Sequence, residues 1–265
     1  MHPLITSHHN AKIKNILTLE KARERKRQNT FVIEGLKELS LAVQGGYKID
    51  SVFFCPEIVD LNDLRDIINQ ENLFIPVQQS VFEKIAYRDS SGGVVAVAEQ
   101  KKHSLATITL RNNPLVLVLE AVEKPGNLGA LLRTADAARI DAVIICDPQT
   151  DFYNPNVIRS SIGCIFTTPI ASATSEEAIH WLKKNNIHLF ATHLQASKPY
   201  YEIDFTSPSA IIMGTESTGL SDQWVKEADA TIIIPMQGKI DSMNVSTAAA
   251  VIIFEASRQR GFTRT

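Results

Sequence analysis

Apolar and polar residues alternate along the chain in a pattern that predicts short strands separated by helices. In the first hundred residues, four short runs rich in Val, Ile and Phe are typical of strands. Between them, apolar residues recur at helical spacing. Strands are expected at 31–33, 51–54, 74–77 and 94–97, and helices at 36–43, 61–69 and 81–86. The pattern predicts a small N-terminal α/β domain.

The second half of the chain has longer apolar runs. Residues 115–119 are continuously apolar, as expected for a strand that is covered on both faces of a parallel sheet. Further strands are expected at 142–146, 167–171, 188–192, 210–213 and 231–234, and helices at 128–139, 176–185, 223–228 and 245–260. This alternation predicts an α/β domain with a mostly parallel sheet.

A polar stretch that ends before Pro114 separates the two halves. Such stretches are typical of linkers between domains. We therefore expect an N-terminal domain at 1–100, a linker at 101–113 and a C-terminal domain at 114–265.

Positive charge is concentrated at the beginning of the chain. The protein has a net charge of −2, yet residues 1–30 carry seven basic and two acidic residues, a net charge of +5. Apolar residues at helical spacing predict one amphipathic basic helix over 10–27. Its charge is either a solvated helix face or a surface that binds phosphates. On the second interpretation the RNA-binding residues are Lys12, Lys14, Arg23, Arg25, Lys26 and Arg27.

The remaining composition is that of a globular protein. No apolar run approaches the roughly 18 residues that cross a bilayer, and the first residues lack the features of a signal peptide, so we expect a cytoplasmic protein without membrane contact. The three cysteines, Cys55, Cys146 and Cys164, are far apart and lie in apolar stretches. We expect buried free thiols, with neither a disulfide nor a bound metal.

Three loops that follow apolar strands are candidates for a site, because ligands of open parallel sheets bind beyond the carboxyl ends of the strands. The first, at 123–129, leads into a helix that carries Arg133, and Asn127 is a candidate cap for that helix. Taken alone, this loop is better interpreted as an ordinary strand-to-helix turn with a surface arginine, because such turns are common.

Neither this loop nor the second one, at 214–221, matches a nucleotide-binding motif. The dinucleotide fingerprint needs a glycine where the first loop has Lys124, and a phosphate loop needs a lysine where the second has Leu220. Ser221 is expected to cap the following helix.

The third loop, at 234–247, mixes polar groups with Ile, Met and Val before an Ala-rich helix. Asn244 is a candidate helix cap. The loop as a whole is typical of a pocket that buries an apolar ligand and holds it by backbone groups.

Taken together and in order, these loops resemble the three motifs of the SpoU/TrmH family of the SPOUT superfamily. The resemblance covers roughly 114–260, and residues 1–100 more loosely resemble a ribosomal-protein-like RNA-binding domain. Position 243 is methionine here and more often leucine in such motifs. The matching residues are Asn127, Gly129 and Arg133, then Gly214, Glu216, Gly219 and Leu220, then Ile234-Pro235-Met236, Ser242-Met243-Asn244-Val245-Ser246 and 248–250.

The resemblance implies a C-terminal sheet with a trefoil knot, a homodimer, and methyl transfer from S-adenosylmethionine to a ribose 2′-hydroxyl in structured RNA. Ribosomal RNA is favoured over transfer RNA as the substrate, and S-adenosylhomocysteine is the expected product. No metal is expected. By resemblance the donor contacts are Thr192, Gly214, Ile234 and Met243.

The resemblance also implies the catalytic residues. Arg133 is expected to stabilise the alkoxide that develops as the hydroxyl loses its proton. Asn127, Glu216 and Asn244 are expected to orient the ribose and the arginine, and Ser242 is a weaker candidate. Two alternatives stay open: a SPOUT enzyme that methylates a base nitrogen, and a non-catalytic RNA-binding protein. The all-round apolar helix at 245–260 is expected near the dimer interface.

Overall fold

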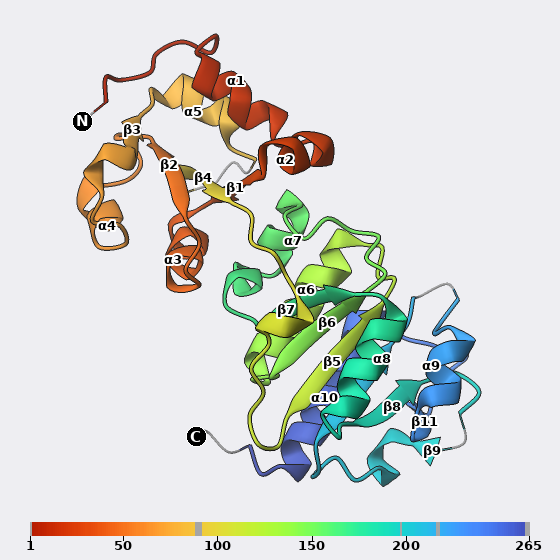
Figure 1. The fold of residues 1–265 in the computed structure, drawn as a ribbon. Coiled ribbons are helices and arrows are strands. Elements are labelled where there is room, and N and C mark those ends of the chain that lie inside the picture. The colour runs from red at the N-terminus through yellow and green to blue at the C-terminus, as the bar shows by residue number, and fades with distance from the viewer. Residues whose placement is uncertain (1, 88–91, 197, 216–217, 263–265) are drawn as a thin grey trace. The chain divides into compact units, whose positions relative to one another are not determined.

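The chain divides by its internal contacts into two units. The computed structural model describes residues 2–87, 92–196, 198–215 and 218–262. The first unit contains residues 1–102 and 151–167, and the second contains residues 103–150 and 168–265 (Figure 1). The expected division had placed the whole of 114–265 in one body. Among the described residues, no helix combines the length and the apolar character needed to cross a bilayer.

The first unit is built on a four-stranded sheet with the order β1-β4-β2-β3. Strand β4 runs antiparallel to β1 and β2, and β3 runs parallel to β2. Apolar side chains of α1 and α5 pack against β2, β3 and β4. The elements are α1 (Ala11–Thr18), α2 (Ala22–Gln28), β1 (Thr30–Glu34), α3 (Leu36–Gln44), β2 (Ile49–Phe54), α4 (Leu61–Arg65), β3 (Phe74–Pro76), α5 (Gln79–Ile85) and β4 (Val94–Glu99).

The single basic helix expected over 10–27 is wrong, because the structure has two helices with a break between them. The guanidinium of Arg25 donates hydrogen bonds to the carbonyl oxygens of Leu19 and Glu20, at 2.7 and 2.8 Å. In a continuous helix these carbonyls would accept from backbone N–H groups one turn later. The arginine side chain therefore satisfies the carbonyls at the break.

Residues 151–167 interrupt the second half of the chain and pack with the first unit. They contain two helices that the sequence pattern did not predict, α7 (Pro155–Ser160) and a 3-10 turn, η3 (Cys164–Phe166). Tyr153 stacks on Phe31 of β1 with ring centroids 4.3 Å apart. Asp151 forms an ion pair with the buried Arg25 at 2.6 Å. These contacts make the segment part of the first unit's core.

The second unit contains a seven-stranded sheet with the order β7-β6-β5-β10-β8-β11-β9, in which every pair is parallel. Helices α8 and α9 cover one face, and α6 and α10 pack together (Figure 1). Strand β7 begins three residues later than expected, and the two-residue β9 was not predicted. The elements are β5 (Leu115–Glu120), α6 (Pro125–Ala137), β6 (Ala142–Cys146), β7 (Ile170–Ala173), α8 (Ser175–Lys184), β8 (His188–Thr192), β9 (Lys198–Pro199), β10 (Ser209–Met213), α9 (Asp222–Glu227), β11 (Ala230–Ile233) and α10 (Val245–Gln259).

The cysteines are free thiols, and two of the three are buried as expected. Cys164 is instead partly exposed. Burial raises the pKa of Cys55 to about 11 and also raises the pKa of Cys146. Both buried thiols are therefore protonated at neutral pH, and neither is a nucleophile there.

Candidate active site

A cavity of about 560 Å³ opens beyond the carboxyl ends of β8, β10 and β11 in the second unit. This is the edge at which open parallel sheets bind ligands, and the volume is in the usual range for a small-molecule pocket. The walls come from the ends of these three strands, from the beginning of α10, and from the loops that contain the second and third family-like motifs. The lining residues are Thr192, His193, Leu194, Gln195, Met213, Gly214, Thr215, Thr218, Gly219, Ile232, Ile233, Ile234, Met236, Asp241, Ser242, Met243, Asn244, Val245, Ala248 and Ile252.

All four residues expected to contact the methyl donor line this one cavity: Thr192, Gly214, Ile234 and Met243. They come from three different strand ends and from the loop before α10. The hydroxyl of Thr192 donates to the carbonyl oxygen of Ile212 at 2.9 Å. This bond ties the end of β8 to β10 and orients the threonine side chain.

Gly214 lies where no side chain fits. A Cβ at this position would be 2.5 Å from the backbone nitrogen of Leu220 and nearer still to the carbonyl of Gly219. Backbone bonds between Thr215 and Gly219, at 3.1 and 3.2 Å, close the loop. Gly219 has a φ of +70°, a conformation that glycine adopts without strain. The close approach of Gly214 to the backbone of Gly219 and Leu220 therefore depends on glycine at position 214, and the positive φ favours glycine at position 219.

Two of the expected catalytic residues are in contact. The side-chain amide of Asn244 donates to the side-chain oxygen of Asn127 at 3.1 Å. Asn244 also caps α10, as expected, by accepting from the backbone N–H of Ser246 at 3.0 Å. This contact joins the cavity wall to the helix that carries the first family-like motif.

The expectation that Asn127 caps α6 is wrong. The helix begins at Pro125 with Lys124 in the cap position, so Asn127 lies in the first turn. Proline is favoured at the first helical position because its missing N–H would have no partner there. The side chain of Asn127 is consequently available to Asn244.

Arg133 is exposed on α6 and does not line the cavity. Within the described part of the chain its guanidinium forms neither a hydrogen bond nor an ion pair. Ser242 lines the cavity, and its hydroxyl donates to Asp241 at 3.1 Å. Glu216 lies outside the described residues.

Five of the six expected RNA-binding residues are exposed on the first unit: Lys12, Lys14, Arg23, Lys26 and Arg27. The assignment of Arg25 is wrong, because its side chain is only 2% exposed and is held by Asp151 and by the carbonyls of the helix break. It stabilises the first unit and cannot reach a phosphate.

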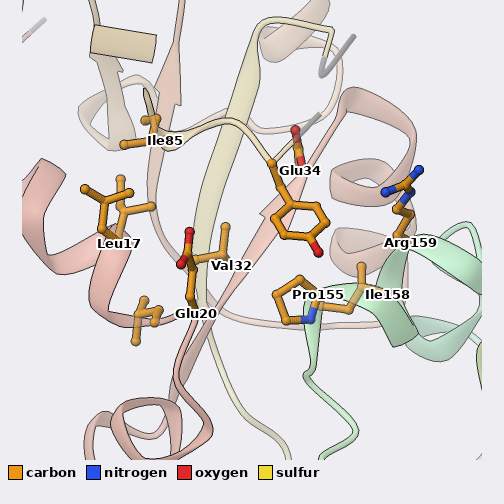
Figure 2. A pocket seen from close by; sticks show the side chains of 11 residues that line it. Leu17, Glu20, Val32, Glu34, Ile85, Pro155, Ile158 and Arg159 are labelled. Carbon is orange, nitrogen blue, oxygen red and sulfur yellow. The ribbon is translucent and has the colours of Figure 1, made fainter. Parts of the chain in front are cut away.

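A second, much smaller cavity lies in the first unit. Its volume is about 40 Å³, far below that of a cofactor pocket. Its walls come from both sections of chain that make up this unit, and they carry the carboxylates of Glu20 and Glu34 beside apolar side chains (Figure 2). The candidate site is therefore the cavity beyond the strand ends of the second unit, which is large enough for a cofactor and lies at the edge where parallel sheets bind ligands.

A buried carboxylate that bonds to the loop at the wall of this cavity was not among the expected site residues. Glu120, the last residue of β5, is 8% exposed. Its oxygens accept from the backbone N–H and the hydroxyl of Ser221, at 2.7 and 2.6 Å. Ser221 occupies the cap position of α9, as expected, but its side chain forms no capping bond to the helix. Only the glutamate at the end of an apolar strand pointed to this contact in the sequence.

Comparison with known proteins identifies the family. The sequence model of the SpoU rRNA Methylase family matches residues 114–254, and that of the MRM3-like substrate binding domain matches residues 10–96. A 23S rRNA (guanosine-2′-O)-methyltransferase, RlmP, from Bacillus subtilis is 30% identical over 94% of this chain and 97% of its own length. The chain belongs to the SpoU rRNA methylase family.

Solved structures of family members share the fold. An rRNA methyltransferase from Sinorhizobium meliloti with AdoMet bound superimposes with a TM-score of 0.88, at 32% identity, over 97% of each chain. The SpoU methyltransferase AviRb from Streptomyces viridochromogenes, in complex with the cofactor AdoMet, gives 0.86 at 28% identity over 96% of this chain and 100% of its own. The expected family, the parallel α/β fold with an N-terminal substrate-binding domain, and the class of S-adenosylmethionine-dependent RNA methyltransferase are confirmed.

Proposed function

We propose that this SpoU family member transfers a methyl group from S-adenosylmethionine to a ribose 2′-hydroxyl in 23S ribosomal RNA. The observation that carries the proposal is the single cavity lined by Thr192, Gly214, Ile234 and Met243, linked through Asn244 to Asn127 of the first motif. The relative from Bacillus subtilis is a 23S rRNA guanosine 2′-O-methyltransferase, and a relative from Streptomyces viridochromogenes that is 30% identical is a 23S rRNA uridine 2′-O-methyltransferase. These relatives favour ribosomal RNA over transfer RNA as the substrate, and the ribose over the base as the group that is methylated.

The cavity suits the methyl donor. Its apolar walls and the backbone groups of Gly214, Ile234 and Met243 are the kind of surface that holds an adenosine and an amino-acid moiety. The absence of a side chain at Gly214 lets its backbone approach that of Gly219 and Leu220, so the loop at the cavity wall is compact. When bound, S-adenosylmethionine supplies an electrophilic methyl group on a sulfonium sulfur.

Arg133 and the asparagines supply the remaining chemistry. A guanidinium keeps its positive charge near neutral pH, so Arg133 acts as an electrostatic partner for the oxygen that loses its proton, or for a neighbouring phosphate. Its exposure and its lack of an ion pair within the described residues leave it available to RNA. Asn127 and Asn244 orient the ribose, and Glu216 is proposed to act with them.

The first unit supplies affinity for RNA. Lys12, Lys14, Arg23, Lys26 and Arg27 are exposed there, and each contact with a phosphate releases counterions. Residues 10–96 match a substrate-binding domain, which supports this role.

We also propose that the protein is a homodimer with α10 near the interface and with the trefoil knot implied by the resemblance. Phe254 is 41% exposed on α10 and lies on one helical face with Thr247, Val251 and Arg258. A second copy of the chain would bury this ring. In such a dimer Arg133 acts either in its own site or in the site of the partner.

The proposal is tested by Arg133→Ala with two measurements. Tritium transfer into ribosomal RNA under single-turnover conditions should fall by about 10²–10³, the usual loss for one oxyanion contact. Calorimetric binding of S-adenosylmethionine should stay unchanged, because Arg133 does not line the cavity. Arg133→Lys should rescue little activity, since an ammonium lacks the planar fork of the guanidinium.

Lys184→Ala is the matched control, because it removes a positive charge from an exposed position on α8 of the same unit. Transfer by Arg133→Ala within about threefold of wild type would remove Arg133 from the mechanism. A parallel loss of donor binding would show that Arg133 maintains the pocket and does no chemistry.

A further inference from the structure

Glu120 is a buried carboxylate whose partners carry no positive charge. Among the described residues its bonds go to the backbone N–H and hydroxyl of Ser221 and, at 3.2 Å, to the hydroxyl of Ser175. Burying a carboxylate is costly unless hydrogen bonds compensate it, and bonds to an ionised acceptor are the strong ones. The buried carboxylate of Glu120 is therefore stabilised mainly by its two bonds shorter than 2.8 Å, both of which Ser221 donates.

Ser221 uses its side chain in an unusual way for its position. A serine in the cap position of a helix normally accepts from a backbone N–H of the first turn. Here no such bond forms, and the hydroxyl donates to Glu120. Glu120 thus holds Ser221 at two points, which restricts both the position and the rotation of this residue.

The clamped residue directly follows the cavity wall. Gly219 lines the cavity, Leu220 is buried in the core at 7% exposure, and Ser221 comes next in the chain. Gly219 also forms the backbone bonds to Thr215 that close the loop against Gly214. Glu120 itself ends the strand that leads into α6, which carries the first family motif.

We propose that Glu120 is a positioning residue that holds the second-motif loop at the wall of the methyl-donor cavity. It fixes Gly214 and Gly219 relative to the first motif by clamping Ser221. The inference rests on the proposed function, because it assumes that the donor occupies this cavity.

Ser175, the second residue that bonds to Glu120, offers a matched control. Ser175 has one hydroxyl proton, and its shorter bond goes to Asp147 at 2.8 Å. Its oxygen accepts from the indole N–H of Trp224, which is fully buried, at 3.1 Å. Ser175→Ala therefore disturbs the same buried polar cluster without releasing Ser221.

The experiment compares Glu120→Ala, Glu120→Gln, Ser221→Ala and Ser175→Ala in the full-length protein. Thermal unfolding, calorimetric binding of S-adenosylmethionine, and KM and kcat for methyl transfer are measured for each. Glu120→Ala should raise the donor Kd and KM about tenfold, the usual effect of losing bonds to a charged group, and leave kcat at saturating donor within about threefold.

Glu120→Gln should recover most of the donor affinity, because its amide oxygen accepts from the Ser221 N–H and its amide nitrogen donates to the hydroxyl. Ser175→Ala should lower the melting temperature and leave the donor Kd unchanged. If Glu120→Ala does not fold, Ser221→Ala replaces it in the test. This variant removes one of the two bonds between Ser221 and Glu120, lies at an exposed position, and should raise the donor Kd about threefold.

Wild-type donor affinity in Glu120→Ala, or in Ser221→Ala where the first variant does not fold, would overturn the inference and leave the proposed function standing. An equal loss of affinity in Ser175→Ala would also overturn it, because the cluster would then be structural only. If the wild-type protein fails to bind S-adenosylmethionine, the proposed function itself is wrong.

Discussion

Replacing Gly214 with alanine should weaken the binding of S-adenosylmethionine more than it weakens the fold. The added Cβ would lie 2.5 Å from the backbone nitrogen of Leu220 and closer to the carbonyl of Gly219. Both obstacles are backbone atoms, so no side chain can rotate away to relieve the clash. The loop that lines the cavity has to move instead.

The size of the effect follows from the usual cost of overpacking. Forcing one additional carbon into a packed site costs about 1–3 kcal/mol. If the bound state bears about 2 kcal/mol of this cost, the donor Kd rises about 30-fold, since each 1.4 kcal/mol is a factor of ten. Isothermal titration calorimetry with S-adenosylmethionine measures this change directly.

Gly126→Ala is the matched control. A Cβ at Gly126 meets no atom within 4 Å, and the residue lies in the first turn of α6, where alanine is the better helix former. Its donor affinity should equal that of wild type. A Gly214→Ala protein that binds the donor within about threefold of wild type would refute the role assigned to the loop backbone.

Three further outcomes are expected. Arg25→Ala should lower the free energy of unfolding by about 3 kcal/mol, because it leaves Asp151 and two carbonyls without their partner. Arg23→Ala should leave urea unfolding unchanged and reduce the slope of RNA affinity against salt concentration by about 0.7–0.9. Burial raises the pKa of Cys55 from 9.0 to about 11, so the neutral thiol contributes its full stability below pH 9, and this contribution is lost as the pH rises through about 11. The free energy of unfolding of Cys55→Ala, measured in urea, should lack this decline. Phe254→Asp should give monomers in light scattering, and a dimer that persists would contradict the proposed interface.

The fold was predictable where one local pattern decides the structure. The apolar run at the beginning of the second unit predicted β5, because a short run without polar positions is typical of a strand covered on both faces. Motif resemblance also selected four residues from distant parts of the chain that the structure brings to one cavity. Thr192 and Met243 are an example, since no spacing in the sequence relates them.

The remaining features depend on contacts between residues far apart in the sequence. The break between α1 and α2 is maintained by Arg25, which pairs with Asp151 from 126 residues away. The clamp on Ser221 comes from Glu120, which is 101 residues earlier. Local propensity carries no information about such partners, so neither feature was expected.

The packing of residues 151–167 with the first unit was not predictable for the same reason. Their position in the sequence places them between β6 and β7 of the second unit, and only contacts with distant residues, such as Tyr153 on Phe31 and Asp151 with Arg25, show that they complete the first. An aromatic residue in a loop does not reveal which core it will join.

The chemical identity of the methylated nucleoside tests the central claim most directly. Ribosomal RNA that lacks the modification is incubated with the protein and S-adenosylmethionine, digested to nucleosides and analysed by mass spectrometry. A 2′-O-methyl group blocks alkaline cleavage of the next phosphodiester bond, so an alkaline digest of the same RNA shows independently whether the methyl group is on the ribose. We expect one new 2′-O-methylnucleoside and one new alkali-resistant dinucleotide, both formed about 10²–10³ times more slowly with Arg133→Ala. A methylated base, with every dinucleotide cleaved by alkali, would contradict the account.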